Sequence, residues 1–132
     1  MTDWQRLEIE SKVLCVLADA PEHDPTHHFG RPFLTAYQLA IEFEARHPAE
    51  AAIIGPVGGA GIGQHTSLSQ YLAHELSRRI KSGELPQVEG GFLSNLHLHD
   101  VSFGHPPNTI HSSLTKSQFE LSMFRLADRD RL

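Results

Sequence analysis

A hydroxyl-bearing residue followed three positions later by glutamine occurs four times in this chain of 132 residues. The pairs are Thr2 with Gln5, Thr35 with Gln38, Ser67 with Gln70, and Thr115 with Gln118. In such a capping box the hydroxyl accepts a hydrogen bond from the N3 amide, and the glutamine side chain reaches back to the cap amide. Because these amides lack partners only at a helix start, the repeated signature predicts four helix N-termini.

Three helices are expected in the first two-thirds of the chain, over Asp3–Ala20, Thr35–His47 and Ser67–Ser82. Each carries an apolar stripe at helical spacing, and Pro21, Pro48 and Gly83 follow the three predicted ends. We therefore expect three rods that dock side by side through these stripes. The apolar run from Ala51 to Ile54 fits either a short buried strand or the end of a helical turn.

The period changes beyond Pro86. Leu96, Leu98, Val101 and Phe103 predict an extended segment, Gly104–Asn108 a turn and Thr109–Leu114 a partner strand, which together form a β-hairpin. Ser117–Leu126 fits two structures, because Phe119 to Met123 alternate like a strand whereas Phe119, Met123 and Leu126 share a helix face. The capping box and the staple of Leu114 with Phe119 favour a last helix.

The predicted fold class is therefore α+β: three N-terminal helices, a β-hairpin near the C-terminus and a possible last helix. This is a winged-helix-like order, and residues 1–132 are expected to form a single globular domain. One feature argues against a helix-turn-helix unit, because the connection between the second and third helices is much longer than the three or four residues such a unit uses.

Composition limits the classes of partner. The formal charge of −5 argues against a general binder of nucleic acid or of anionic membranes, since both favour net positive charge. Ten histidines would reverse that sign if all were protonated. The start Met1-Thr2-Asp3-Trp4 lacks the basic and apolar segments of a secretory signal, so a cytoplasmic location is expected. The single cysteine, Cys15, falls in an apolar helical pattern and is expected to be a buried thiol.

A glycine-rich loop, Gly58–Gly63, runs into the third predicted helix. Free amides at a helix start can bind an anion, which makes Gly59, Gly61, Gly63, Thr66 and Ser67 candidate residues for a phosphate or carboxylate. The known phosphate signatures are absent, because Gly63 is followed by Gln64 where a P-loop needs lysine, and the glycines miss the dinucleotide spacing. A connector, or a close packing of helices, is the favoured interpretation.

Histidine and nucleophile patterns predict no catalytic residue, cofactor or metal. His97 and His99 would share one face of an extended segment, but no third ligand stands at a fixed spacing, so a solvated strand face is favoured. Ser67 or Thr66 beside His65 lacks the geometry of a nucleophile with its base. An enzyme is therefore the less favoured class.

Two surfaces remain as binding candidates. In a DNA-binding winged helix, Ser69, Gln70, His74, Ser77, Arg78 and Lys81 would form the outward face of the third helix. For a protein partner, Phe29, Phe33 and Phe92 are candidate apolar anchors, although they could also pack into the core. The prediction is a non-catalytic binding or regulatory module, with a protein partner preferred. The alternatives are DNA binding through Ser67–Ser82, and a small enzyme or anion-binding protein using Gly58–Gly63.

Overall fold

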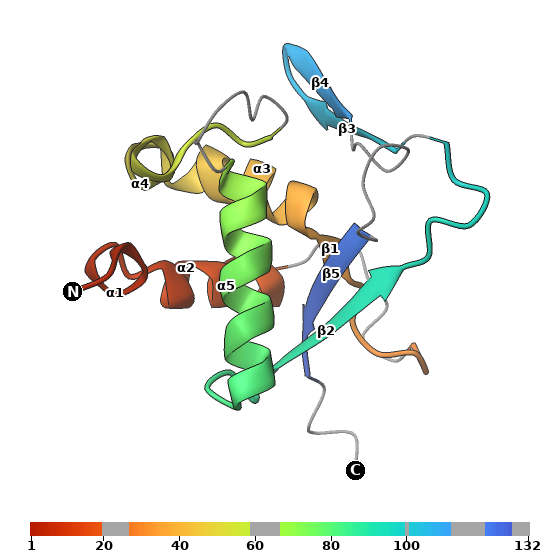
Figure 1. The fold of residues 1–132 in the computed structure, drawn as a ribbon, viewed down its shortest axis with the longest axis horizontal. Coiled ribbons are helices and arrows are strands. Elements are labelled where there is room, and N and C mark those ends of the chain that lie inside the picture. The colour runs from red at the N-terminus through yellow and green to blue at the C-terminus, as the bar shows by residue number, and fades with distance from the viewer. Residues whose placement is uncertain (20–26, 59–66, 100, 112–120, 128–132) are drawn as a thin grey trace.

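The computed structural model describes residues 1–19, 27–58, 67–99, 101–111 and 121–127 (Figure 1). In these ranges it has helices α1 (Asp3–Arg6), α2 (Ile9–Ala18), α3 (Ala36–Arg46), α4 (Pro48–Ile54) and α5 (Leu68–Ser82). The strands are β1 (Leu34–Thr35), β2 (Val88–Leu93), β3 (Ser102–His105), β4 (Asn108–His111) and β5 (Leu121–Leu126). The predicted α+β class is confirmed. None of the described helices is long and apolar enough to cross a membrane.

Three of the four predicted capping boxes are formed. The amides of Gln5, Gln38 and Gln70 donate to the hydroxyls of Thr2, Thr35 and Ser67 over 3.3, 3.1 and 3.2 Å. In each box the glutamine side chain also accepts from the cap amide, over 2.7 Å at Thr35. The fourth pair, Thr115 and Gln118, lies outside the described residues. These side chains are therefore local determinants of where α1, α3 and α5 begin.

The prediction that the first helix is one continuous rod is wrong. The helix is broken at Leu7 and Glu8, and Glu8 adopts a left-handed conformation with φ 52°. On a straight helix Trp4 and Ile9 would point about 140° apart, yet both are buried here. The break turns both side chains into the core. The Lys12 ammonium then donates to the Leu7 carbonyl over 2.7 Å, which satisfies a group freed by the break.

The other helices agree closely with the predicted ends. Helix α3 ends at Arg46. Helix α5 ends at Ser82 and is followed by Gly83, whose φ of 85° is the left-handed cap that glycine adopts readily. The run from Ala51 to Ile54 belongs to a helix rather than to a strand. Pro48 begins that helix, α4, where its missing N–H leaves no intrahelical bond unmade.

The main sheet is antiparallel, with strand order β1-β5-β2. The predicted last helix over Ser117–Leu126 is wrong for residues 121–126, because these form the central strand β5. Leu34 of β1 and Gly90 of β2 both lie opposite Phe124. Pairing on both sides outweighs the local helical preference. Strand β2 was not predicted, because its central Gly90 and Gly91 weaken the strand signal.

The predicted β-hairpin is confirmed over β3 and β4, which pair antiparallel as a separate two-stranded sheet. Its predicted N-terminal extension is wrong. Leu96 and His97 lie in a turn, closed by a 3.0 Å hydrogen bond from the Leu98 amide to the Asn95 carbonyl, and His97 has φ 62°. His97 and His99 therefore do not share a strand face.

The order of elements differs from the predicted order in two further ways (Figure 1). A short strand, β1, enters between α2 and α3 and joins the main sheet. The hairpin β3–β4 is part of the long connection from β2 to β5, and it lies apart from the main sheet in Figure 1. The main sheet lies beside α5 in the same view, α1 and α4 lie on the opposite side of α5, and α2 and α3 cross behind it.

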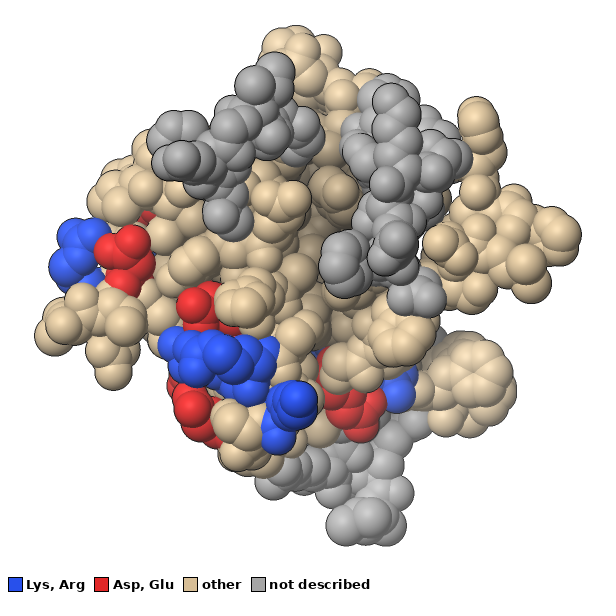
Figure 2. Space-filling model, in the orientation of Figure 1, with Lys and Arg blue, Asp and Glu red and all other residues tan. Residues whose placement is uncertain are grey.

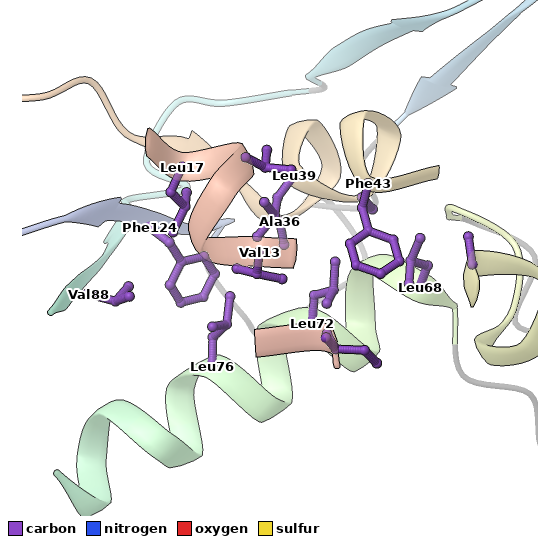
Figure 3. Packing of buried hydrophobic residues seen from close by; sticks show 14 of the residues in the cluster. Val13, Leu17, Ala36, Leu39, Phe43, Leu68, Leu72, Leu76, Val88 and Phe124 are labelled. Carbon is purple, nitrogen blue, oxygen red and sulfur yellow. The ribbon is translucent and has the colours of Figure 1, made fainter. Parts of the chain in front are cut away.

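One hydrophobic core joins the helices to the sheet (Figure 3). The predicted stripes meet there, and the Phe124 ring, only 1% exposed, points in among Val13, Leu76 and Val88. Its largest fully buried side chains are Phe43, Phe124, Ile9, Leu17, Leu39, Leu68, Leu72, Leu76, Leu85, Val13 and Val16. The three rods do dock through their stripes, with the first of them bent.

We predict that Phe124→Ala lowers the free energy of unfolding by about 3–5 kcal/mol, because it leaves a cavity between sheet and helices. Urea denaturation followed by circular dichroism measures the change. Met123→Ala is the matched control, because Met123 is the adjacent residue of β5 and is only half-buried. Equal losses in the two variants would contradict the assignment of Phe124 to the core face of a strand.

Candidate functional site

The anion-binding candidates fall mostly outside the described residues, which exclude Gly59, Gly61, Gly63 and Thr66. Ser67 is described and is buried. Its hydroxyl accepts from the Gln70 amide over 3.2 Å and lies 3.1 Å from the Ser69 hydroxyl. The Ser67 oxygen therefore serves the helix cap and a buried contact.

The nucleic-acid candidates on α5 do not all face outward. Ser69 was predicted on the outer face, but it is 3% exposed, so this part of the prediction is wrong. The remaining members Gln70, His74, Ser77, Arg78 and Lys81 are exposed. The Gln70 side chain accepts from the Ser67 amide over 3.2 Å, so part of this residue is used in capping.

Carboxylates accompany the arginines at the C-terminal end of α5. Arg78 lies 2.9 Å from Glu75, and this hydrogen bond raises the pKa of Arg78. Arg79 is buried, contacts Glu75 and Glu84 over 3.3 and 2.9 Å, and stacks on the Trp4 ring at 4.5 Å. Figure 2 shows basic and acidic side chains interleaved over the lower half of α5. The positive charge predicted for this helix is therefore largely compensated.

The partner-binding candidates all belong to the region of the main sheet, but they differ in exposure. Phe29 is 72% exposed and Phe92 is 68% exposed. Phe33 is half-buried, because the Arg125 guanidinium lies over its ring at 4.3 Å. Phe33 also approaches Gly91, the neighbour of Phe92 in β2. Phe29 and Phe92 are thus available to a partner, whereas Phe33 supports the loop.

Arg125 is the residue that connects these parts, and the sequence analysis did not single it out. Its Nε donates to the Glu89 carboxylate over 2.6 Å across the β2–β5 pair. One terminal nitrogen donates to the main-chain carbonyls of Phe29 and Arg31 over 2.7 and 3.0 Å. The loop before β1 is thereby held against the sheet. Only the correct choice of strand for residues 121–126 would have placed Arg125 opposite Glu89.

Three rings gather at the tip of this loop. His27 and His28 are stacked at 4.7 Å, and Phe29 lies 5.1 and 4.4 Å from them. The Phe29 amide donates to Nδ1 of His27 over 3.0 Å, so that nitrogen acts as an acceptor. All three side chains are exposed. The tip is therefore an ordered aromatic projection.

A second group of exposed apolar side chains follows along the chain from Phe92. We call Phe92, Leu93 and Leu96 the β2-end residues; they lie at the end of β2 and in the turn after it. Leu96 is 71% exposed, and Leu93 is also exposed. Isolated exposed leucines are ordinary on protein surfaces. Phe92 and Leu93 are neighbours on a strand and point to opposite faces of the sheet, so large apolar side chains are exposed on both sides of this end of β2.

The hairpin β3–β4 packs against α3. The Phe103 ring stacks on Tyr37 at 5.1 Å, and this burial raises the pKa of the Tyr37 phenol. His105 Nε2 lies 2.8 Å from the Glu44 carboxylate. The hairpin is thus attached to the body of the protein by an aromatic contact, by a polar contact and by the packing of Ile110 against the core.

The remaining chemical candidates are scattered. His97 and His99 are exposed. Within the described residues, no three histidine, cysteine, aspartate or glutamate side chains are placed to hold a metal ion. The prediction of a buried Cys15 is wrong, because this thiol is exposed on α2. The stripe there faces the core with Val13, Val16 and Leu17, and Cys15 falls outside it.

We predict that Arg125→Met speeds hydrogen exchange in the segment 27–33, because the variant loses the bonds that hold the Phe29 and Arg31 carbonyls. Exchange followed by mass spectrometry measures this. Arg6→Met is the matched control, since the Arg6 guanidinium forms an exposed ion pair with Asp3 within α1. Unchanged exchange in the Arg125 variant would show that the loop does not depend on this residue.

No protein-family model matches this chain, and comparisons with curated proteins and with solved structures find no match either.

Proposed function

We propose that this protein is a non-catalytic, protein-binding module that docks through Phe29 and the β2-end residues. The observation that carries this proposal is the exposure of large apolar side chains on an ordered scaffold, about seventy per cent at each of Phe29, Phe92 and Leu96. When a partner covers an aromatic ring, a large apolar area is removed from water. Aromatic residues therefore commonly contribute most of the binding energy.

The attachment of the loop supports the same proposal. Arg125 holds the Phe29 carbonyl and lies over Phe33, so the Phe29 backbone is fixed by a side chain of the central strand. Binding then costs less conformational entropy than it would for a free loop. A regulatory role fits a module of this kind, since its output would be the presence or absence of the bound partner.

Nucleic-acid binding through α5 is the second candidate. The winged-helix-like order and the exposed polar face of Gln70, His74, Arg78 and Lys81 favour it. The formal charge of −5 and the pairing of Arg78 with Glu75 weigh against it. Phosphate contacts need uncompensated cations, because the release of counterions supplies much of the affinity. Protein binding is therefore the better-supported function.

We predict that a photoreactive phenylalanine analogue placed at Phe92 or at Phe29 forms a covalent adduct with a protein in cells that make this chain. The analogue at Ala52, an exposed position on α4, is the control and should form none. Mass spectrometry of the adducts reports the result. Adducts at neither aromatic position, with the fold intact, would remove the proposed docking surface.

We also predict that mixed-sequence duplex DNA is not retarded by the protein at micromolar concentration and physiological salt. Electrophoretic shift measures this. A dissociation constant well below the non-specific range of about 10⁻⁶ M would favour the second candidate instead. In that case Lys81→Ala should weaken the complex and reduce its salt dependence, which would assign the contact to α5.

A further inference from the structure

Strand β2 lies at one edge of the main sheet. Its main-chain amides and carbonyls point alternately toward β5 and toward the outer edge, and the register shows which residues point each way. The register that places Val88 opposite Leu126 continues to Gln87 and Ala127, where the Ala127 amide donates to the Gln87 carbonyl over 2.7 Å. In an antiparallel ladder such bonded pairs recur at every second residue. Glu89 and Gly91 therefore bond toward β5, and the amides and carbonyls of Gly90 and Phe92 point to the outer edge.

Among the described residues, no strand pairs with that outer edge. The Val88 amide also points to the outer edge, but it donates to the Leu85 carbonyl over 3.2 Å. The open part of this edge therefore begins after Val88. Natural edge strands usually carry lysine, proline or a bulge that discourages pairing. The segment Val-Glu-Gly-Gly-Phe-Leu has neither lysine nor proline, and Gly90 and Gly91 leave the backbone uncovered.

We propose that a second copy of this chain adds its own β2 to this edge, antiparallel, about a two-fold axis at Gly90. This inference rests on the proposed function and names the partner. Outward-pointing groups must face one another in such a pair, so even-numbered residues pair with even-numbered residues. The two Gly90 residues then exchange N–H···O bonds, and the Phe92 amide donates to the Val88 carbonyl of the second copy.

The side chains are compatible with this symmetric register. Val88, Gly90 and Phe92 share the sheet face that packs on the helices, because Gly90 approaches Ile80 and the Phe124 ring on that side. Phe92, 68% exposed in one copy, would lie across from the apolar Val88 of the other. Glycine at the axis leaves room where two side chains would otherwise meet.

The charges are also compatible. On the other face, the register places Glu89 across from Gly91 of the second copy, so no two carboxylates oppose each other. Glu89 keeps its contact with Arg125 at 2.6 Å. An edge-to-edge pair of six-residue strands buries less area than an obligate dimer, so a reversible dimer is expected.

Sedimentation velocity of the purified chain, from low to high micromolar concentration, tests this. We expect a concentration-dependent dimer, and Phe92→Lys should weaken association about tenfold or more, because it removes the ring and places a charge on the edge. Ile53→Lys is the matched control: it places the same charge at an exposed apolar residue of α4, 53% exposed, and should leave the dimer unchanged. A chain that stays monomeric throughout overturns the proposal.

The register is tested with the same photoreactive analogue at Phe92 in the purified chain. The expected adduct joins two copies and maps to the residues around Val88; an adduct between copies that maps elsewhere overturns this register. If purified protein forms no adduct between copies while cells yield one with a different protein, this inference fails and the proposed function stands. If neither adduct forms, both this inference and the proposed function fail.

Discussion

Burial of the Phe124 ring connects the two halves of this protein. The ring is held in the core shared by α2, α3 and α5, and the strand that carries it bonds to β1 on one side and to β2 on the other. This contact, together with those of Val88 and Leu34, therefore sets where the three strands lie relative to the helices. Arg125, the next residue, points to the opposite face of the sheet because side chains alternate along a strand, and it attaches the loop before β1.

The sequence was most informative where structure depends on nearby residues. Thr35, Ser67 and Gly83 set helix ends through contacts within a few positions, and these ends were predictable. Strand β5 was not, because residues 121–126 satisfy both periods and the choice is made by β1 and β2, which are far away in sequence. The break at Glu8 likewise follows from the burial of two side chains that a straight helix would separate.

The candidate surface was only partly predictable for the same reason. Phe29 and Phe92 could be named as aromatic residues in segments without helical pattern, but their exposure depends on which faces the sheet leaves open. The role of Arg125 depends on the β2–β5 register, which no local pattern encodes. On α5, Ser69 was predicted to be exposed. It is buried, and its hydroxyl contacts that of Ser67 at the start of the helix.

The way the loop is attached has an evolutionary consequence. Arg125 holds the loop by donating to the main-chain carbonyl oxygens of Phe29 and Arg31. Every amino acid has such an oxygen. Substitutions at His27, His28 or Phe29 would therefore alter what the tip presents without releasing it from the sheet. Such a division would let the side chains of the tip vary while the attachment of its backbone is kept.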